Sequence, residues 1–204
     1  MSKAIRIAVF VSGGGTNLQA LLDAQAEGSL HSGKIVLVLS SKEGVFALER
    51  AKKAGVPFAV VPHAACNGQE AFEAGISALL AEYRVDLIVL AGFLSILSAG
   101  FTRRWEKRIL NVHPSLIPAF CGKGFYGLKV HEEALRRGVK VTGATVHFVN
   151  EVPDGGEIIL QKAVSVRKND TPRSLQLRVM RLAEWKLLPR AAEIVSADLL
   201  SKKK

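Results

Sequence analysis

One strand-like segment constrains the fold of this chain more than any other feature. Asp86 is followed by Leu-Ile-Val-Leu-Ala, an apolar run over residues 87–91 that lacks the alternation of a half-exposed strand. Strands of this kind lie in parallel sheets whose two faces are both covered by helices. Because parallel strands need long crossover connections, helices should alternate with strands along the chain.

The rest of the chain shows this alternation. Short apolar runs predict strands over residues 5–12, 34–40, 57–61, 87–91, 108–112, 141–149 and 157–166. Longer amphipathic runs predict helices over residues 17–26, 44–54, 69–83 and 130–137, and a last helix from about 172 into the 190s. A chain of 204 residues, 49% of them hydrophobic, suits one core. We therefore predict a single α/β domain over residues 1–200, with a doubly wound, mostly parallel sheet, followed by a basic tail over 201–204.

Composition narrows the classes of function. No apolar run approaches the roughly 20 residues that span a bilayer, and the sequence from Met1 lacks the pattern of a signal peptide. Cys66 and Cys121 have neither metal-ligand spacing nor a disulfide framework. We expect no metal, no membrane contact and a cytoplasmic location. The net charge of +10 favours an anionic partner. We expect a charged metabolite rather than nucleic acid, because no stacking motif or zinc module accompanies the basic residues.

A glycine turn between the first predicted strand and helix indicates an anion site. In Ser-Gly-Gly-Gly-Thr-Asn-Leu, residues 12–18, the backbone can approach an anion at a helix N-terminus, where N–H groups are unpaired. Leu18 stands where the dinucleotide fingerprint needs a third glycine, and Ser40-Ser41-Lys42 lacks its ribose-binding acid. The pattern favours a lone phosphate monoester, although a tight turn with ordinary capping has the same sequence. The candidate phosphate-binding residues are Gly15, Thr16 and Asn17.

Asn111 and His113 end a predicted central strand, which is where open α/β sheets place their active sites. Being two residues apart on a strand, they leave the same face. An amide donor beside an imidazole can stabilise an oxyanion and transfer protons during attack on an acyl carbon. Asp154 could join them, because a carboxylate favours protonated His113. Taken alone, His113 could equally be a structural histidine at a strand end.

Five segments appear in order: Ser-Gly-Gly-Gly-Thr-Asn-Leu-Gln (12–19), Leu-Ala-Gly-Phe-Leu-Ser-Ile-Leu-Ser (90–98), Asn-Val-His-Pro-Ser-Leu-Ile-Pro (111–118), Gly-Ala-Thr-Val-His-Phe-Val (143–149) and Asp-Gly-Gly-Glu-Ile-Ile (154–159). Together they resemble the glycinamide ribonucleotide formyltransferases. The resemblance implies a Rossmann-like formyltransferase fold, acting as a monomer or homodimer. It also implies metal-free transfer of a formyl group from 10-formyltetrahydrofolate to the amine of glycinamide ribonucleotide, in purine synthesis.

The resemblance also assigns roles to residues. Asn111 and His113 would stabilise the oxyanion and Asp154 would support His113, in a C-terminal half that also binds folate. The N-terminal half would bind the substrate phosphate, and Glu184 would contact its ribose. The folate would lie along Phe93, Leu94, Ser95, Ile96, Leu97, Val149, Asn150 and Glu151. His147 falls at a motif position of the family, and a structural role for it is equally open.

Three positions depart from the family pattern. Ser95 and Gln69 stand where members often carry Arg, and Cys121 stands where Pro is usual. Cys121 lies in a long loop over residues 114–128 that we expect to act as a lid or a binding loop.

Three other functions remain as alternatives. Methionyl-tRNA formyltransferases carry a further C-terminal domain, for which we expect no room. Formyltetrahydrofolate deformylases usually add an N-terminal module and need no phosphate turn. A module that only binds nucleotide or nucleic acid would not need Asn111, His113 and Asp154.

Overall fold

One sheet of seven strands runs through the computed structural model, which describes residues 4–203. The strand order is β3-β2-β1-β4-β5-β6-β7. The strands are β1 (Ile5–Val11), β2 (Gly33–Ser40), β3 (Phe58–Val60), β4 (Leu87–Leu90), β5 (Ile109–His113), β6 (Val141–Phe148) and β7 (Ile158–Ser165). The pairs among β1 to β5 are parallel, whereas β6 pairs antiparallel with both β5 and β7. The predicted mostly parallel sheet is confirmed.

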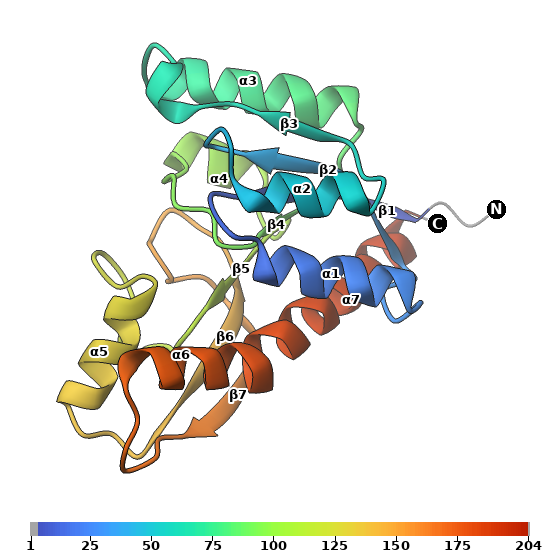
Figure 1. Cartoon of the computed structure of the whole chain (residues 1–204). Helices are drawn as coiled ribbons and strands as arrows, with labels where there is room; N and C mark the ends of the chain where they lie inside the picture. The colour runs from blue at the N-terminus through green and yellow to red at the C-terminus, as the bar shows by residue number, and fades with distance from the viewer. Residues whose placement is uncertain (1–3, 204) are drawn as a thin grey trace.

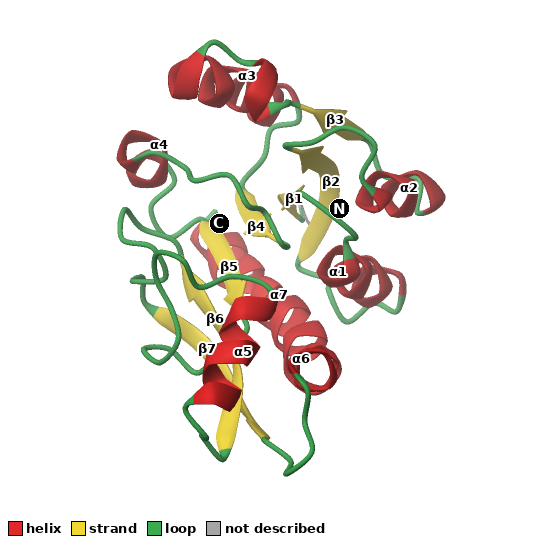
Figure 2. Cartoon of the chain, turned by 60° about the vertical axis from the view of Figure 1, so that its left-hand side comes forward, coloured by secondary structure: helices red, strands yellow, loops and turns green. Residues whose placement is uncertain are grey.

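Helices cover both faces of this sheet (Figures 1 and 2). The helices are α1 (Thr16–Ala26), α2 (Phe46–Lys53), α3 (Gly68–Glu82), α4 (Ala99–Arg104), α5 (Leu128–Arg136), α6 (Pro172–Val179) and α7 (Trp185–Lys202). A short 3-10 helix spans His63–Ala65, and a π-helical turn spans Met180–Glu184. Within residues 4–203, no helix is both long and apolar enough to cross a membrane.

Two core clusters explain why β4 is apolar throughout. Leu87 and Val89 belong to the cluster that contains the buried side chains of α1, α6 and α7. Ile88 and Leu90 belong to the cluster on the other face, with the buried side chains of α3 and with Phe101 of α4. Every side chain of the strand is therefore buried, as the uninterrupted apolar run predicts.

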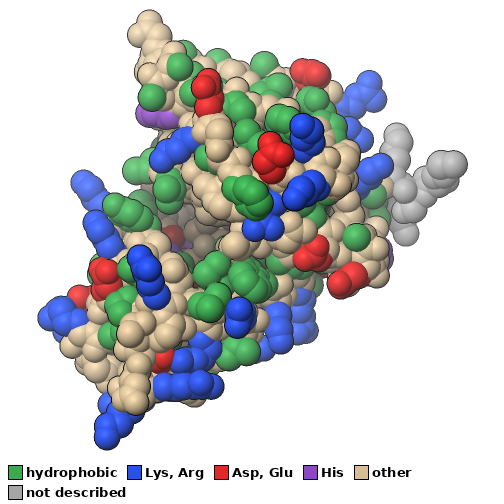
Figure 3. Space-filling view, viewed as in Figure 1, with side chains coloured by type: hydrophobic (Ala, Val, Ile, Leu, Met, Phe, Trp, Pro, Cys, Tyr) green, Lys and Arg blue, Asp and Glu red, His purple; other side chains and the backbone are tan. Residues whose placement is uncertain are grey.

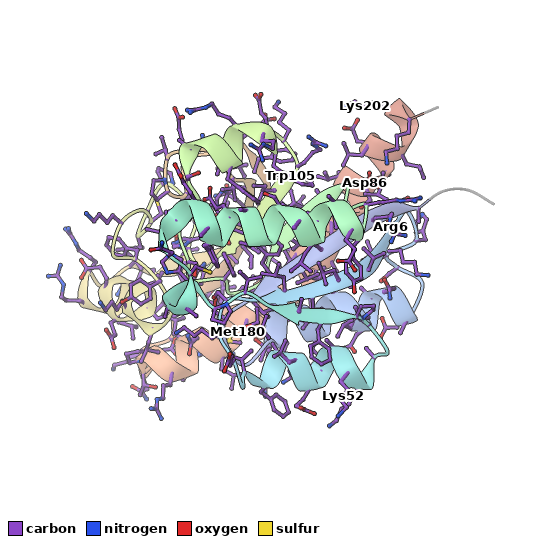
Figure 4. All side chains as sticks on the ribbon, turned by 90° about the horizontal axis from the view of Figure 1, so that it is seen from above. Arg6, Lys52, Asp86, Trp105, Met180 and Lys202 are labelled. Carbon is purple, nitrogen blue, oxygen red and sulfur yellow. The ribbon has the colours of Figure 1, made fainter. Side chains whose placement is uncertain are left out.

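The C-terminal helix differs from the prediction. The chain continues from α6 through the π-helical turn into α7, which includes Pro189 and runs to Lys202. The predicted basic tail over 201–204 therefore begins inside a helix, and Lys204 lies outside the described residues. The Lys203 ammonium and the Arg6 amide both donate to Asp86, 2.5 and 2.9 Å away. Figure 4 shows Arg6, Asp86 and Lys202 at one end of the molecule.

The strand order brings three loops to one edge of the sheet. The order reverses at β1, which has β2 on one side and β4 on the other, and β5 follows β4. The carboxyl ends of parallel strands meet at the same edge. The glycine turn after β1, the segment after β4 and the end of β5 therefore lie next to one another.

Candidate functional site

Asn111 and His113 point from the same face of β5 toward a turn that follows β6. Antiparallel pairing places Asn111 opposite His147 and His113 opposite Thr145. In that turn, Asp154 Oδ2 lies 3.5 Å from His113 Nδ1, and Asp154 Oδ1 lies 3.5 Å from Asn111 Nδ2 and from His147 Nε2. The structure thus brings together the three residues that the sequence singled out, with His147 as a fourth. We call Asn111, His113, His147 and Asp154 the polar cluster.

The local backbone aims the Asp154 carboxylate into this cluster. Asp154 has a left-handed φ of 55°, and a Cβ on Gly156 would lie 1.8 Å from the Phe148 carbonyl oxygen, so the turn requires glycine there. The Gly122 amide donates to Asp154 Oδ2 at 2.9 Å. Burial alone would raise the pKa of Asp154. The contact with His147, the Gly122 hydrogen bond and the charge on His113 outweigh it, so that pKa is lowered. Asp154 is therefore an anion at neutral pH.

The long loop over residues 114–127 closes on His113. The ring is 4% exposed, and its Nε2 lies 2.8 Å from the carbonyl oxygen of Phe120. Because a carbonyl only accepts, Nε2 carries a proton and Nδ1 faces Asp154. Phe120 itself has a left-handed φ of 51°. The loop therefore orients both His113, through Phe120, and Asp154, through Gly122.

A second buried histidine lies close to His113. His131 on α5 is 0% exposed, and neither of its ring nitrogens has a hydrogen-bond partner among residues 4–203. Burial, with a smaller contribution from the charge on His113, lowers the pKa of His131 to about 4. His131 is therefore neutral near physiological pH. No pattern in the sequence indicates this histidine, because a lone histidine on a helix resembles any other helical position.

The three glycines of the turn after β1 differ in what surrounds them. Gly15 precedes α1 with a left-handed φ of 71°, and a Cβ there would lie 2.7 Å from the Cβ of Ala47 on α2. A Cβ on Gly13 or Gly14 would meet nothing within 4 Å. The open surface that an anion could approach therefore lies at Gly13 and Gly14. Gly15 serves the backbone and the packing of α2, and its contact with a phosphate stays a prediction.

Arg50 supports this turn from α2, which the sequence did not indicate. Its Nε donates to the carbonyl oxygen of Gly14 at 2.9 Å, and its Nη1 donates to Gln19 at 2.9 Å. The sequence could not predict this contact, because Arg50 is one of several charged residues on an amphipathic helix. A groove of about 760 Å³ runs from here between α1 and α7 and has Thr16 in its lining, whereas the polar cluster does not line it.

Asn17 and Glu184 form a buried pair beneath the turn. Asn17 Nδ2 donates to Glu184 Oε2 at 2.9 Å, and the two residues are 8% and 6% exposed. Glu184 ends the π-helical turn, a conformation that is frequent at functional sites. Burial raises the pKa of Glu184 to about 7, against the opposing effect of the Asn17 hydrogen bond. Asn17 Oδ1 is buried and has no hydrogen-bond partner in the part of the chain that the structure describes.

The segment over residues 93–97 follows β4 and is tied at two points. The Leu94 amide donates to Ser12 Oγ at 3.0 Å, and Gln69 Nε2 donates to the Ile96 carbonyl oxygen at 2.9 Å. Leu94 and Ile96 are 57% and 77% exposed. Gln69, which departs from the family pattern, thus anchors this segment through its backbone. We call residues 93–97 the β4 segment.

The residues expected near folate only partly come together. Phe93 and Leu97 of the β4 segment pack against the same core cluster as Val149. Asn150 bonds the backbone of its own turn, and Glu151 pairs with Arg103 at 2.8 Å. The face in Figure 3 is hollowed between the part that carries α2 and α3 and the part that carries α5 and α6.

Among residues 4–203, no group of three or more His, Cys, Asp or Glu could hold a metal ion. The polar cluster instead combines an amide donor, imidazole rings and an ionised carboxylate. Such a set can stabilise an oxyanion and move protons in acyl transfer.

Comparison with known proteins gives consistent matches. Residues 5–192 match the formyl transferase family. The trifunctional purine biosynthetic protein adenosine-3 of Bos taurus is 46% identical over 96% of this chain, and the chain spans 19% of that relative's length. The chloroplastic phosphoribosylglycinamide formyltransferase of Arabidopsis thaliana is 41% identical over 86% of this chain and 60% of its own. The crystal structure of glycinamide ribonucleotide transformylase 1 from Symbiobacterium toebii has a TM-score of 0.89 at 41% identity, over 96% of this chain and 89% of that one.

Proposed function

Because this chain belongs to the formyl transferase family, we propose that it transfers a formyl group from 10-formyltetrahydrofolate to the amine of glycinamide ribonucleotide in purine synthesis. This substrate is supported by the names of the Arabidopsis thaliana relative and of the Symbiobacterium toebii structure, which both refer to glycinamide ribonucleotide. One observation carries the chemistry: Asp154 lies within 3.5 Å of both Asn111 and His113 at the edge of the sheet where the glycine turn begins.

In this proposal, Asn111, His113 and Asp154 act on the tetrahedral species that forms when the amine attacks the formyl carbon. Asn111 donates an N–H to the oxyanion. His113, whose Nδ1 lies 3.5 Å from Asp154 Oδ2, stabilises the same negative charge in its protonated form. The bond from the formyl carbon to N10 of the folate then breaks. The amine loses a proton and N10 gains one, with His113 and Asp154 assisting the transfer. The proposal needs no metal, because these side chains supply the acid–base chemistry.

The two substrates would bind at the loops that flank the polar cluster. The phosphate would lie at the glycine turn with Gly15, Thr16 and Asn17, where the helix N-terminus and the open surface of Gly14 favour an anion. Ribose hydroxyls would donate to Glu184 and to the unpartnered Asn17 Oδ1. The folate would lie against the β4 segment and residues 149–151.

Formyl-donor consumption, measured with and without glycinamide ribonucleotide, tests this function. We expect consumption only when the ribonucleotide is present. Asn111→Ala should lower turnover by about 100- to 1000-fold, because it removes an oxyanion donor, and ribonucleotide binding should stay near that of the wild type.

The exposed Asn169 offers a matched control, because Asn169→Ala should keep wild-type turnover. Equal consumption without the ribonucleotide would indicate donor hydrolysis and contradict the transfer. An Asn111→Ala variant that keeps most of its turnover would contradict the role of Asn111.

A further inference from the structure

His147 is a buried histidine that the proposed chemistry does not yet use. It lies on β6 directly opposite Asn111 and is 1% exposed. Its Nε2 lies 3.2 Å from Asn111 Nδ2, so it contacts the amide that would bind the oxyanion.

The backbone fixes which ring nitrogen of His147 carries the proton. Nδ1 lies 2.8 Å from the carbonyl oxygen of Phe148, and a carbonyl only accepts, so Nδ1 must donate. In the neutral ring, Nε2 is then an acceptor. The nitrogen of the Asn111 amide only donates, so an N–H of Asn111 points at His147 Nε2.

This contact determines the orientation of the whole Asn111 amide. A flipped amide would turn its oxygen toward two acceptors, His147 Nε2 and the Asp154 carboxylate, which both repel it. A doubly protonated His147 would instead direct Nε2–H to Asp154 Oδ1, 3.5 Å away, and lose the amide bond. With Nε2 as the acceptor, the ring holds Asn111 Nδ2 toward the cluster. One of its two hydrogens is bonded to His147, and the other has only Asp154 at 3.5 Å.

We propose that His147 is a positioning residue that fixes the Asn111 amide with one N–H directed at the formyl oxygen. The inference rests on the proposed function, since it acts through the oxyanion contact of Asn111. His147 itself would not touch the substrates. Its removal should therefore affect turnover and leave substrate affinity nearly unchanged.

A double-mutant cycle tests this coupling. His147→Ala should lower kcat by about 10- to 100-fold, the usual effect of a misplaced catalytic group, with little change in either KM. His147→Gln, which offers an acceptor oxygen near the former Nε2, should recover part of the loss. In an Asn111→Ala background, His147→Ala should cause no further loss, because the group it positions is gone.

The control is His31→Gln, which changes an exposed histidine paired with Glu193 and should keep wild-type kcat. Thermal melts accompany each variant, and if His147→Ala does not fold, His147→Gln takes its place in the cycle. Equal fold losses in the wild-type and Asn111→Ala backgrounds would overturn the inference. So would a larger rise in KM than fall in kcat.

A measurement that needs no activity separates this inference from the proposed function. The side-chain amide of Asn111, followed by ¹⁵N NMR, should show a hydrogen-bonded proton that is lost in His147→Ala. An unchanged amide signal would overturn the positioning role even in an active enzyme. A wild-type protein that shows the bonded proton but no formyl transfer would contradict the proposed function alone.

Discussion

Glu184 is an acid that folding transfers from water into a buried site. Its hydrogen-bond donor is the Asn17 amide, and burial raises its pKa from 4.5 to about 7. The folded protein therefore holds the Glu184 proton more tightly than the unfolded chain does. The resulting contribution to stability is complete below pH 4.5 and is lost as the pH rises through 7.

Glu184→Gln should remove this pH dependence. Between about pH 5 and about pH 8, the free energy of unfolding of the wild type should fall relative to the variant by up to about 3 kcal/mol. Urea unfolding at both pH values measures the difference. Glu82→Gln, on the exposed end of α3, is the matched control and should keep the wild-type dependence. Parallel curves for the wild type and Glu184→Gln would contradict the raised pKa.

At the residue scale, the sequence predicted contacts that depend on strand register and on glycine turns. Asn111 and His113 followed from their spacing at a strand end, and Asp154 from its Asp-Gly-Gly turn. The burial of His131 and the reach of Arg50 could not be predicted. Both depend on how distant helices pack, and a single sequence carries no pattern for that.

At the scale of elements, the glycine turn shows how identical residues take different roles. A Cβ on Gly14 would point into open space. Gly15 has a left-handed backbone, and a Cβ there would collide with Ala47. Substitution at the first should therefore affect a ligand, and substitution at the second should affect folding.

Gly14→Ala should leave the melting temperature at or above that of the wild type. It should raise the KM for glycinamide ribonucleotide about tenfold or more. This change corresponds to the free energy of one hydrogen bond to a charged group. The KM for the folate should not change. Gly15→Ala, the matched variant, should lower the melting temperature because its Cβ would collide with α2. A Gly14→Ala enzyme with wild-type KM values would show that the phosphate lies elsewhere.

The predicted elements agree with the structure to within a few residues, because the apolar period marks strands and helices well. Helix α4 was missed because its six residues are too few to show a helical period. The π-helical turn at Met180–Glu184 was missed as well, because it continues the helical pattern on both sides. This turn ends at Glu184, which is a residue of the candidate site, so the site includes a conformation that the sequence did not predict.

At the scale of the molecule, the net charge is unevenly distributed along the chain. Residues 101–204 carry 20 of the 28 Lys and Arg and 10 of the 18 Asp and Glu, so the whole net charge of +10 lies in this half. The same half contributes the polar cluster and Glu184. A positive half favours the approach of the two anionic substrates that the proposed reaction combines. The alternation of elements predicted the parallel sheet. The strand order, which places β1, β4 and β5 together, emerges only from the folded structure.

The central claim is that a formyl carbon passes directly from folate to the substrate amine at this edge of the sheet. The most direct test uses 10-formyltetrahydrofolate with a ¹³C-labelled formyl group and glycinamide ribonucleotide with a ¹⁵N-labelled amine. We predict a product whose ¹³C signal is split by the bonded ¹⁵N, formed only when enzyme and both substrates are present. Label that accumulates as free formate, with or without the ribonucleotide, would contradict the account.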